Sequence, residues 1–252
     1  MGDGGNSPEI RFERNIIIRG KIVCRTGLRI GGLQEEIKIG GVENIIIRDP
    51  ITDKPYIPGS SIKGKLRSLL ELNEKAYSQD GLPHSHSTEC GKENCKICRI
   101  FGSSSEDVKR GPTRLIVRDS FLESELEEVE VKAENVINRL TGKAEHPRFM
   151  ERVPAGTEFG LEMVYGVYLK EDIDDLKTVF ELMGQLQDSY LGGSGSRGYG
   201  KVEFKDISIT VKRREDYVEG RQAEPLDVDG KNKFTVPELI TEFEKIREKM
   251  GN

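Results

Sequence analysis

The chain has 252 residues, of which 33% are charged, and a formal net charge of −5. Its length suffices for one sizeable core, and its charge excludes a protein that holds nucleic acid by overall positive charge, so any polyanion site must be local. No apolar run approaches the ~18 residues of a membrane span, and the N-terminal residues lack the apolar core of a signal peptide. We therefore expect a cytoplasmic protein without membrane contact.

The first predicted strand covers residues 10–24, where Ile, Val and Arg partly alternate. Residues 28–50 follow with two Gly-Gly pairs and three glutamates, Glu35, Glu36 and Glu43. Because glycine pairs interrupt both helices and strands, this segment predicts a turn-rich loop. It ends near Asp49-Pro50.

Residues 58–76 predict an amphipathic helix, with Ser60 or Ser61 as the N-cap and apolar residues on one face. Serine hydroxyls and cationic side chains at a helix start can bind phosphate, although a capped surface helix explains the same residues. The candidate phosphate ligands here are Ser60, Ser61, Lys63, Lys65 and Arg67.

Residues 82–102 differ in composition from the rest of the chain and contain a cluster of cysteines with two histidines upstream. Thiolate and imidazole are the ligands that zinc prefers, and four protein ligands make a structural site because no position stays open for water. The alternative is three unliganded thiols on a polar loop. The predicted ligands are His86, Cys90, Cys95 and Cys98, with His84 as the alternative to His86.

The second half contains two further strands before a helix. Residues 113–121 and 157–169 predict strands by β-branched content and alternation. Between them, residues 123–134 are acidic and expected to be solvated, and residues 135–157 predict a projecting hairpin or loop. This projection carries basic side chains, among them Arg139 and Arg152, which we take as candidate RNA ligands.

Residues 171–190 predict a helix with a core-facing apolar stripe, and residues 201–210 predict the last strand of the core. The glycine-rich loop at 191–200 separates them. Its five glycines allow a close approach of backbone to a ligand, so it predicts either a structural turn or a phosphate contact. The candidate ligands in this loop are Gly193, Ser194, Gly195, Ser196 and Arg197.

The resulting order is strand, helix, strand, strand, helix, strand, which is the order of a ferredoxin-like fold. A terminal helix is expected at 236–249. The strands lack the aromatic stacking strings of an ordinary RNA-recognition motif.

Several motifs in this order resemble one family. They are T-G-L-x-I-G-G at 26–32, I-x-D-P-I-T at 47–52, I-P-G-S-S-I-K-G-K-L-R at 57–67, the cysteine cluster ending in C-R-I-F-G, and L-G-G-S-G-S-R-G-Y-G-K-V at 191–202. Together they resemble the RAMP backbone subunit of the Csm complex, the type III-A CRISPR effector. The resemblance covers about residues 14–212.

The resemblance implies an α+β, ferredoxin-like (RRM-like) core over residues 10–212, with a zinc-binding insertion at 82–102 and a thumb-like hairpin at 135–157. Residues 213–252 form a C-terminal extension. In this family, copies of the subunit stack as a filament along a guide RNA (crRNA) with other Csm-complex subunits. The thumb interrupts the guide–target duplex at intervals, and the target RNA is cut beside each interruption.

The family's catalytic aspartate lies between the Ile-Gly-Gly turn and the Asp-Pro turn, and ungapped alignment puts Glu43 in its place. Asp49 matches the family's Asp-Pro turn, so the resemblance implies that it braces the backbone of this turn. The family chemistry is attack of the ribose 2′-OH on the adjacent phosphate with a divalent metal, magnesium or manganese. Two alternatives are a scaffold without nuclease activity and a metal-independent RNA-processing enzyme that would use His146 as its catalytic histidine.

Overall fold

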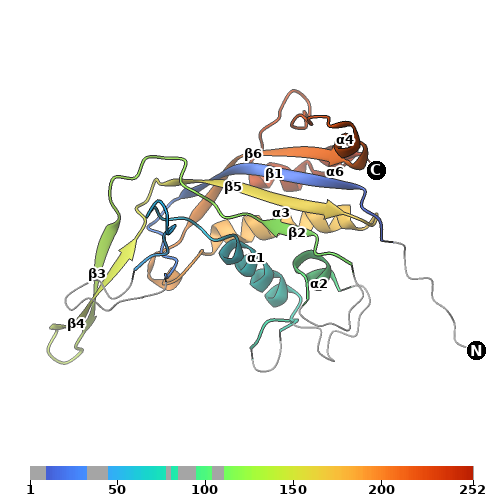
Figure 1. The fold of residues 1–252 in the computed structure, drawn as a ribbon. Helices are drawn as coiled ribbons and strands as arrows, with labels where there is room; N and C mark the ends of the chain where they lie inside the picture. The colour runs from blue at the N-terminus through green and yellow to red at the C-terminus, as the bar shows by residue number, and fades with distance from the viewer. Residues whose placement is uncertain (1–9, 33–44, 78–80, 85–94, 104–110, 252) are drawn as a thin grey trace, which may run out of the picture.

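The computed structural model describes residues 10–32, 45–77, 81–84, 95–103 and 111–251 (Figure 1). At its centre lies an antiparallel sheet with the strand order β2-β5-β1-β6. The two inner strands are β1 (Arg14–Cys24) and β5 (Glu158–Val167), and the outer strands are β2 (Leu115–Val117) and β6 (Val202–Arg213). The inner strand β1 pairs with β5 from Arg14 to Val23 and with β6 along its length, so it is the spine of the sheet.

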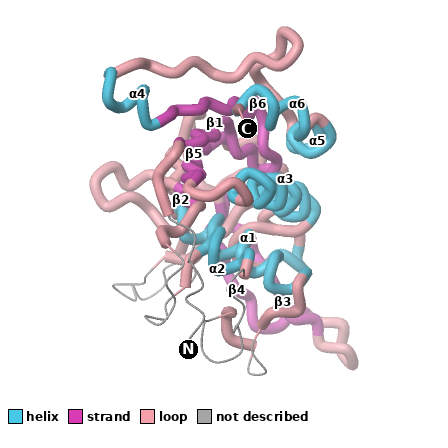
Figure 2. The backbone as a smooth tube through the Cα atoms, turned by 90° about the vertical axis from the view of Figure 1, so that its right-hand side faces the viewer, coloured by secondary structure: helices cyan, strands magenta, loops and turns pink. Residues whose placement is uncertain are grey.

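Two long helices follow the first and third strands of this sheet in the chain. They are α1 (Gly59–Asn73) and α3 (Asp172–Asp188), and Figure 2 shows both on the same side of the strands. With the projecting hairpin set aside, the order β1-α1-β2-β5-α3-β6 is that of a split β-α-β arrangement. The structure is thus a mixed α/β fold with antiparallel sheets.

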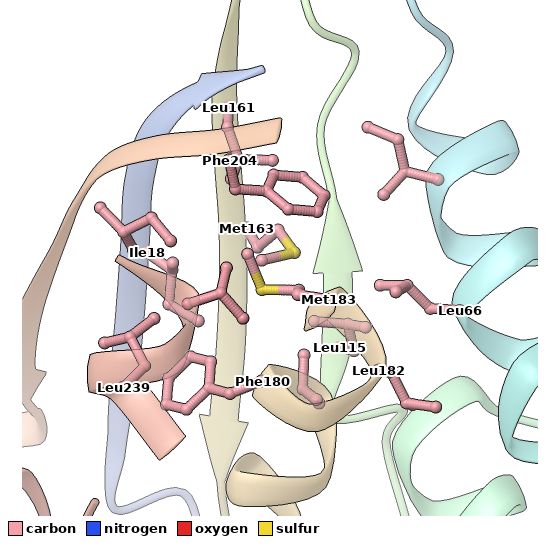
Figure 3. Close-up of a cluster of buried hydrophobic side chains, with 14 of the residues drawn as sticks. Ile18, Leu66, Leu115, Leu161, Met163, Phe180, Leu182, Met183, Phe204 and Leu239 are labelled. Carbon is pink, nitrogen blue, oxygen red and sulfur yellow. The ribbon is translucent and has the colours of Figure 1, made fainter. Parts of the chain in front are cut away.

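The core lies between the sheet and these helices. Ile16, Ile18 and Ile22 of β1 are fully buried, whereas Arg19 on the opposite face is exposed, as the period of a half-buried strand requires. In Figure 3, Met163 of β5 and Met183 of α3 lie in the middle of the cluster. The alternating pattern seen in the sequence therefore places one face of the sheet against the helices.

A separate two-stranded sheet projects from the body of the molecule (Figure 1). It consists of β3 (Glu130–Ile137) and β4 (Ala144–Arg152), inserted in the chain between β2 and β5. The projection was expected to begin at residue 135, but the structure starts it at Glu130, inside the acidic segment. Two acidic residues of this strand form ion pairs, Glu130 with Arg152 of β4 and Glu134 with Arg197 of the glycine-rich loop. These pairs compensate the negative charge of the segment.

The start of α1 also differs from the expectation. Pro58 precedes the helix, no side chain caps it, and Ser60 and Ser61 lie in its first turn. The expected serine N-cap is therefore wrong: the N–H of Gly59 is bound instead by the Asp119 carboxylate, at 2.8 Å. A cap supplied from a distant loop leaves no trace in the local sequence.

Further helices fill the connections. The cysteine-containing segment forms α2 (Lys96–Phe101), which sequence patterns did not predict. After the sheet come α4 (Arg214–Glu219), α5 (Val236–Thr241) and α6 (Phe243–Met250), so the single helix expected at 236–249 is divided in two. A short 3₁₀ turn, η1 (Gly195–Arg197), lies in the glycine-rich loop. No helix in the described ranges is long and apolar enough to cross a bilayer.

Candidate nucleic-acid interface and metal centre

The glycine-rich loop is bound to the turn that follows β1. The N–H of Gly193 donates to the carbonyl of Arg29 at 2.8 Å, and the N–H of Gly200 donates to the carbonyl of Gly27 at 2.9 Å. The N–H of Arg25 completes the contact by donating to the carbonyl of Lys201 at 2.8 Å. Two of the motifs that are far apart in the sequence, at 26–32 and at 191–202, therefore form one structural unit.

Close packing, rather than ligand access alone, requires two of these glycines. Gly192 has a φ of +76°, and a Cβ at this position would lie 2.2 Å from the carbonyl oxygen of Arg29. Gly200 has a φ of +75°, and its Cβ would lie 2.1 Å from the carbonyl oxygen of Leu191. Gly192 and Gly200 are therefore needed for the structural turn. Ser196 and Arg197 of the same loop are exposed to solvent.

The base of the hairpin packs on Tyr199, which ends this loop. The Tyr199 ring is buried between two cations, with Lys132 Nζ 4.5 Å and the Arg152 guanidinium carbon 5.2 Å from its centroid. Arg152 also binds Glu130 through Nε at 2.7 Å. Arg152, a candidate RNA ligand by sequence, is therefore a connection between the hairpin and the loop.

Glu134 of β3 lies beside Tyr199 and pairs with the loop. Its Oε2 is 3.0 Å from Nη1 of Arg197, and its Oε1 is 3.6 Å from Nζ of Lys132. Burial raises the pKa of Glu134, but the Tyr199 hydroxyl and the Arg197 guanidinium outweigh it and lower the pKa below its usual value. Glu134 is consequently ionised at neutral pH and fixes the exposed end of Arg197 relative to the hairpin.

The outer face of the hairpin base contacts a third segment. Glu151 of β4 accepts from Nη2 of Arg48 at 2.6 Å and from the N–H of Ile46 at 2.9 Å. The N–H of Gly32 in turn donates to the carbonyl of Ile45 at 3.2 Å. The two chain ends that flank residues 33–44 are thus joined at the hairpin base, although Glu43 itself lies outside the described residues.

Asp49 braces the adjoining turn, as expected. Its Oδ1 accepts from the N–H and hydroxyl of Thr52, at 2.8 and 2.9 Å, and from the N–H of Ile51 at 3.1 Å. Hydrogen bonds from Thr52 hold the pKa of Asp49 below its usual value. This carboxylate has a structural role.

The basic residues at the start of α1 contact two different segments, the glycine-rich loop region and the segment that carries the cysteines. Lys65 lies 4.2 Å above the ring of Tyr190, next to the glycine-rich loop. Lys63 is half-buried, and this burial, together with the nearby Arg67, lowers its pKa. Arg67 itself binds Glu71 at 2.7 Å and donates to the carbonyl of His84, so it supports the segment that carries the cysteines.

The remaining predicted RNA ligands are spread over the surface. Arg139 lies in the exposed turn between β3 and β4, beside Leu140, which is 98% exposed. Ser60 and Ser61 are at the N-terminal turn of α1. The structure thus gathers Lys65 and Arg197 around the glycine-rich loop, but Arg139 is at the far end of the hairpin.

Three of the predicted metal ligands meet at the start of α2. Nε2 of His84 is 3.3 Å from Sγ of Cys95, and the ligand atoms of His84, Cys95 and Cys98 all lie within 4.8 Å of one another. Around a tetrahedral zinc, sulfur and nitrogen ligands are about 3.5–4 Å apart, so this grouping fits a metal. The structure thus brings His84, the alternative to His86, together with two of the predicted thiols, whereas His86 and Cys90 lie outside the described residues.

Comparison with known proteins assigns the class. The family model described as "RAMP superfamily" matches residues 21–203. The chain therefore belongs to the RAMP superfamily.

The particular family within this class follows from individual relatives. The chain is 47% identical, over 85% of its length and 93% of the relative's, to a protein of Methanothermobacter thermautotrophicus named "CRISPR system Cms endoribonuclease Csm3". It is 42% identical, over 94% of its length and 96% of the relative's, to a protein of the same name in Methanocaldococcus jannaschii. The chain belongs to the Csm3 family.

A solved structure agrees with this assignment. The fold superposes with a TM-score of 0.64, at 35% identity and over 94% of this chain and 98% of the other, on a chain of the "Csm3-Csm4 subcomplex in the type III-A CRISPR-Cas interference complex".

Three residues near the hairpin base were not among the predicted ligands: Lys132, Arg148 and Tyr199. Tyr199 stands inside a quoted motif, but nothing in its spacing shows that it packs against the hairpin. Lys132 stands in an acidic segment that was expected to be solvated. Only the pairing of β3 with β4 brings Arg148 opposite Glu134.

Proposed function

We propose that this protein is a guide-RNA-binding backbone subunit of a type III-A CRISPR effector complex in the cytoplasm. In this proposal, copies stack along crRNA with other Csm subunits and cut complementary target RNA at regular intervals. One observation carries it beyond the family: the hairpin, the glycine-rich loop and the two ends of segment 33–44 meet at one place. A catalytic loop, a duplex-interrupting hairpin and a backbone-binding loop would need this arrangement.

The RNA contacts would be local, because the chain as a whole is negative. Lys65 and Arg197 flank the glycine-rich loop and have their charged ends near the surface. We assign them to phosphates of the guide. Lys63, Ser60, Ser61, Gly193, Ser194, Gly195 and Ser196 form the surrounding backbone-binding surface, while Arg139 at the hairpin turn would meet RNA farther out.

Cleavage would require Glu43 and a divalent metal, magnesium or manganese. The ribose 2′-oxygen attacks the adjacent phosphorus, the 5′-oxygen leaves, and a 2′,3′-cyclic phosphate results. A divalent metal bound beside Glu43 would supply positive charge to offset the negative charge that develops on the phosphate. Glutamate places its oxygens ~1 Å farther from the backbone than aspartate, a displacement that can cost about 100-fold in rate.

The deciding experiment is target-RNA cleavage by the reconstituted complex with magnesium, comparing the natural protein with Glu43→Ala and Glu43→Asp. We expect regularly spaced cuts from the natural protein, none from Glu43→Ala, and faster cutting from Glu43→Asp. Equal target binding without cuts by all three proteins would leave a scaffold that carries no nuclease activity. Cuts that persist in EDTA and disappear with His146→Ala would support the metal-independent alternative.

We also propose that residues 82–102 hold a structural zinc. Cys95 and Cys98 with His84 supply three ligands of the kind zinc prefers, and Cys90 is the natural fourth. His86 remains the alternative to His84. The zinc would stabilise the segment that Arg67 and α2 connect to the core.

A further inference from the structure

The hairpin and the glycine-rich loop enclose a polar hollow, and Arg197 is the one predicted RNA ligand among the described residues that line it. Its volume is about 450 Å³, and its lining includes Lys132 and Glu134 from β3 and His146 and Arg148 from β4. Because Arg197 belongs to the glycine-rich loop and the other lining residues belong to β3 and β4, the hollow lies where the hairpin faces that loop.

Its charged residues are of two kinds. Lys132 and Arg197 are paired with the single carboxylate, Glu134, at 3.6 and 3.0 Å. Arg148 and His146 are exposed, and no ion pair or side-chain hydrogen bond joins either of them to another described residue. The hollow therefore has an excess of positive charge in a chain whose net charge is −5.

A β-bulge places the histidine here. Glu134 pairs with Arg148 and Val136 pairs with Glu145, so His146 and Pro147 stand opposite the single residue Asn135. His146 has a φ of +50°, a backbone conformation that residues other than glycine seldom adopt. Bulges redirect side chains, and strained backbone is frequent at functional sites.

We propose that this hollow is a phosphate subsite for the backbone of one RNA strand, in which Arg148 and His146 donate to the phosphate oxygens. Arg148 supplies the planar fork that matches phosphate. Lys132 and Arg197, oriented by Glu134, provide the surrounding positive potential. The volume fits a nucleotide-sized group and excludes a duplex. The subsite rests on the proposed function, because it names where the RNA backbone passes the hairpin.

The test measures binding of a fluorescent single-stranded RNA to the full chain at several salt concentrations. We expect Arg148→Ala to weaken binding about tenfold and to reduce the slope of log K against log salt by about 0.7, the value for one phosphate contact on a single strand. His146→Ala should weaken binding less, because an imidazole offers one donor. The matched control is Arg214→Ala, which removes an exposed arginine from α4, at the opposite end of the sheet.

The outcomes separate this proposal from the proposed function. If Arg148→Ala binds RNA like the natural protein while Lys65→Ala binds more weakly, the subsite is overturned and the RNA-binding role stands. If the natural protein shows no saturable RNA binding even at the lowest salt concentration, the proposed function fails. Saturable binding of inorganic phosphate that Arg148→Ala abolishes, without any effect on RNA, would overturn the assignment to an RNA backbone.

Discussion

At the scale of single residues, the most constrained charges lie in the core and not at the candidate site. Arg114 is 1% exposed and binds Oδ1 of the fully buried Asp172 at 2.9 Å. The other carboxylate oxygen of Asp172 accepts from the N–H groups of Tyr168 and Leu169, both at 2.9 Å. This carboxylate therefore joins β2 to the start of α3.

We predict that Asp172→Ala lowers the free energy of unfolding by about 3–5 kcal/mol, because it removes the carboxylate that neutralises the buried guanidinium of Arg114. Urea unfolding of the two proteins measures the difference. The control is Glu162→Ala, which breaks the exposed pair with Arg19 at 2.8 Å and should cost about 0.2–1 kcal/mol. Equal losses for both variants would contradict a special role for the buried pair.

At the scale of elements, the sequence predicted those strands and helices whose apolar residues recur at the regular spacing of a strand or a helix. The strands β1, β5 and β6 and the helices α1 and α3 were expected within a few residues, because each has one face buried in the core along its whole length. The strand β2 has only three residues, and its pairing with β5 cannot be read from so short a pattern. The start of β3 was missed because acidic residues are paired across the hairpin.

The candidate site was predictable to a similar degree. Lys65 and Arg197 were both predicted as phosphate ligands, and the structure places Lys65 next to the glycine-rich loop that contains Arg197. The hollow was not predictable, because a bulge at His146 depends on how two strands pair. Arg152 was taken for an RNA ligand on its charge alone, whereas its contact with Tyr199 depends on tertiary packing.

The glycine-rich loop offers a matched pair of glycines. Gly192 and Gly198 both have positive φ, +76° and +84°, but a Cβ at Gly192 would meet the Arg29 carbonyl, while one at Gly198 would meet open space. We predict that Gly192→Ala lowers the free energy of unfolding by more than about 2 kcal/mol and Gly198→Ala by about 1 kcal/mol, the cost of φ alone. Chemical denaturation tests this, and similar losses for both would mean that the close contact relaxes freely.

At the scale of the whole molecule, the cysteine-containing segment is connected to the core through charges. Nε of Arg99 in α2 lies 2.5 Å from Oδ2 of Asp175 in α3. Arg99 directly follows Cys98 and directly precedes the buried Ile100 in the sequence of α2. Burial raises the pKa of Asp175, and the adjacent Arg99 partly offsets this effect. Because the same short helix carries both a metal ligand and this ion pair, loss of the metal should weaken the packing of α2 on α3.

We therefore predict about one zinc per purified chain and a lower melting temperature after a chelator removes it. For a chain of this size, each ~1 kcal/mol of lost stability lowers the melting temperature by about 2–4 °C. Cys98→Ser should lack the metal and should not respond to the chelator. Cys24→Ala is the control: burial raises the pKa of the Cys24 thiol to about 12, so this cysteine offers no thiolate and its loss should leave the zinc content unchanged. Metal-free natural protein that melts at the same temperature as the loaded protein would contradict a structural zinc, and metal loss from Cys24→Ala would place the site elsewhere.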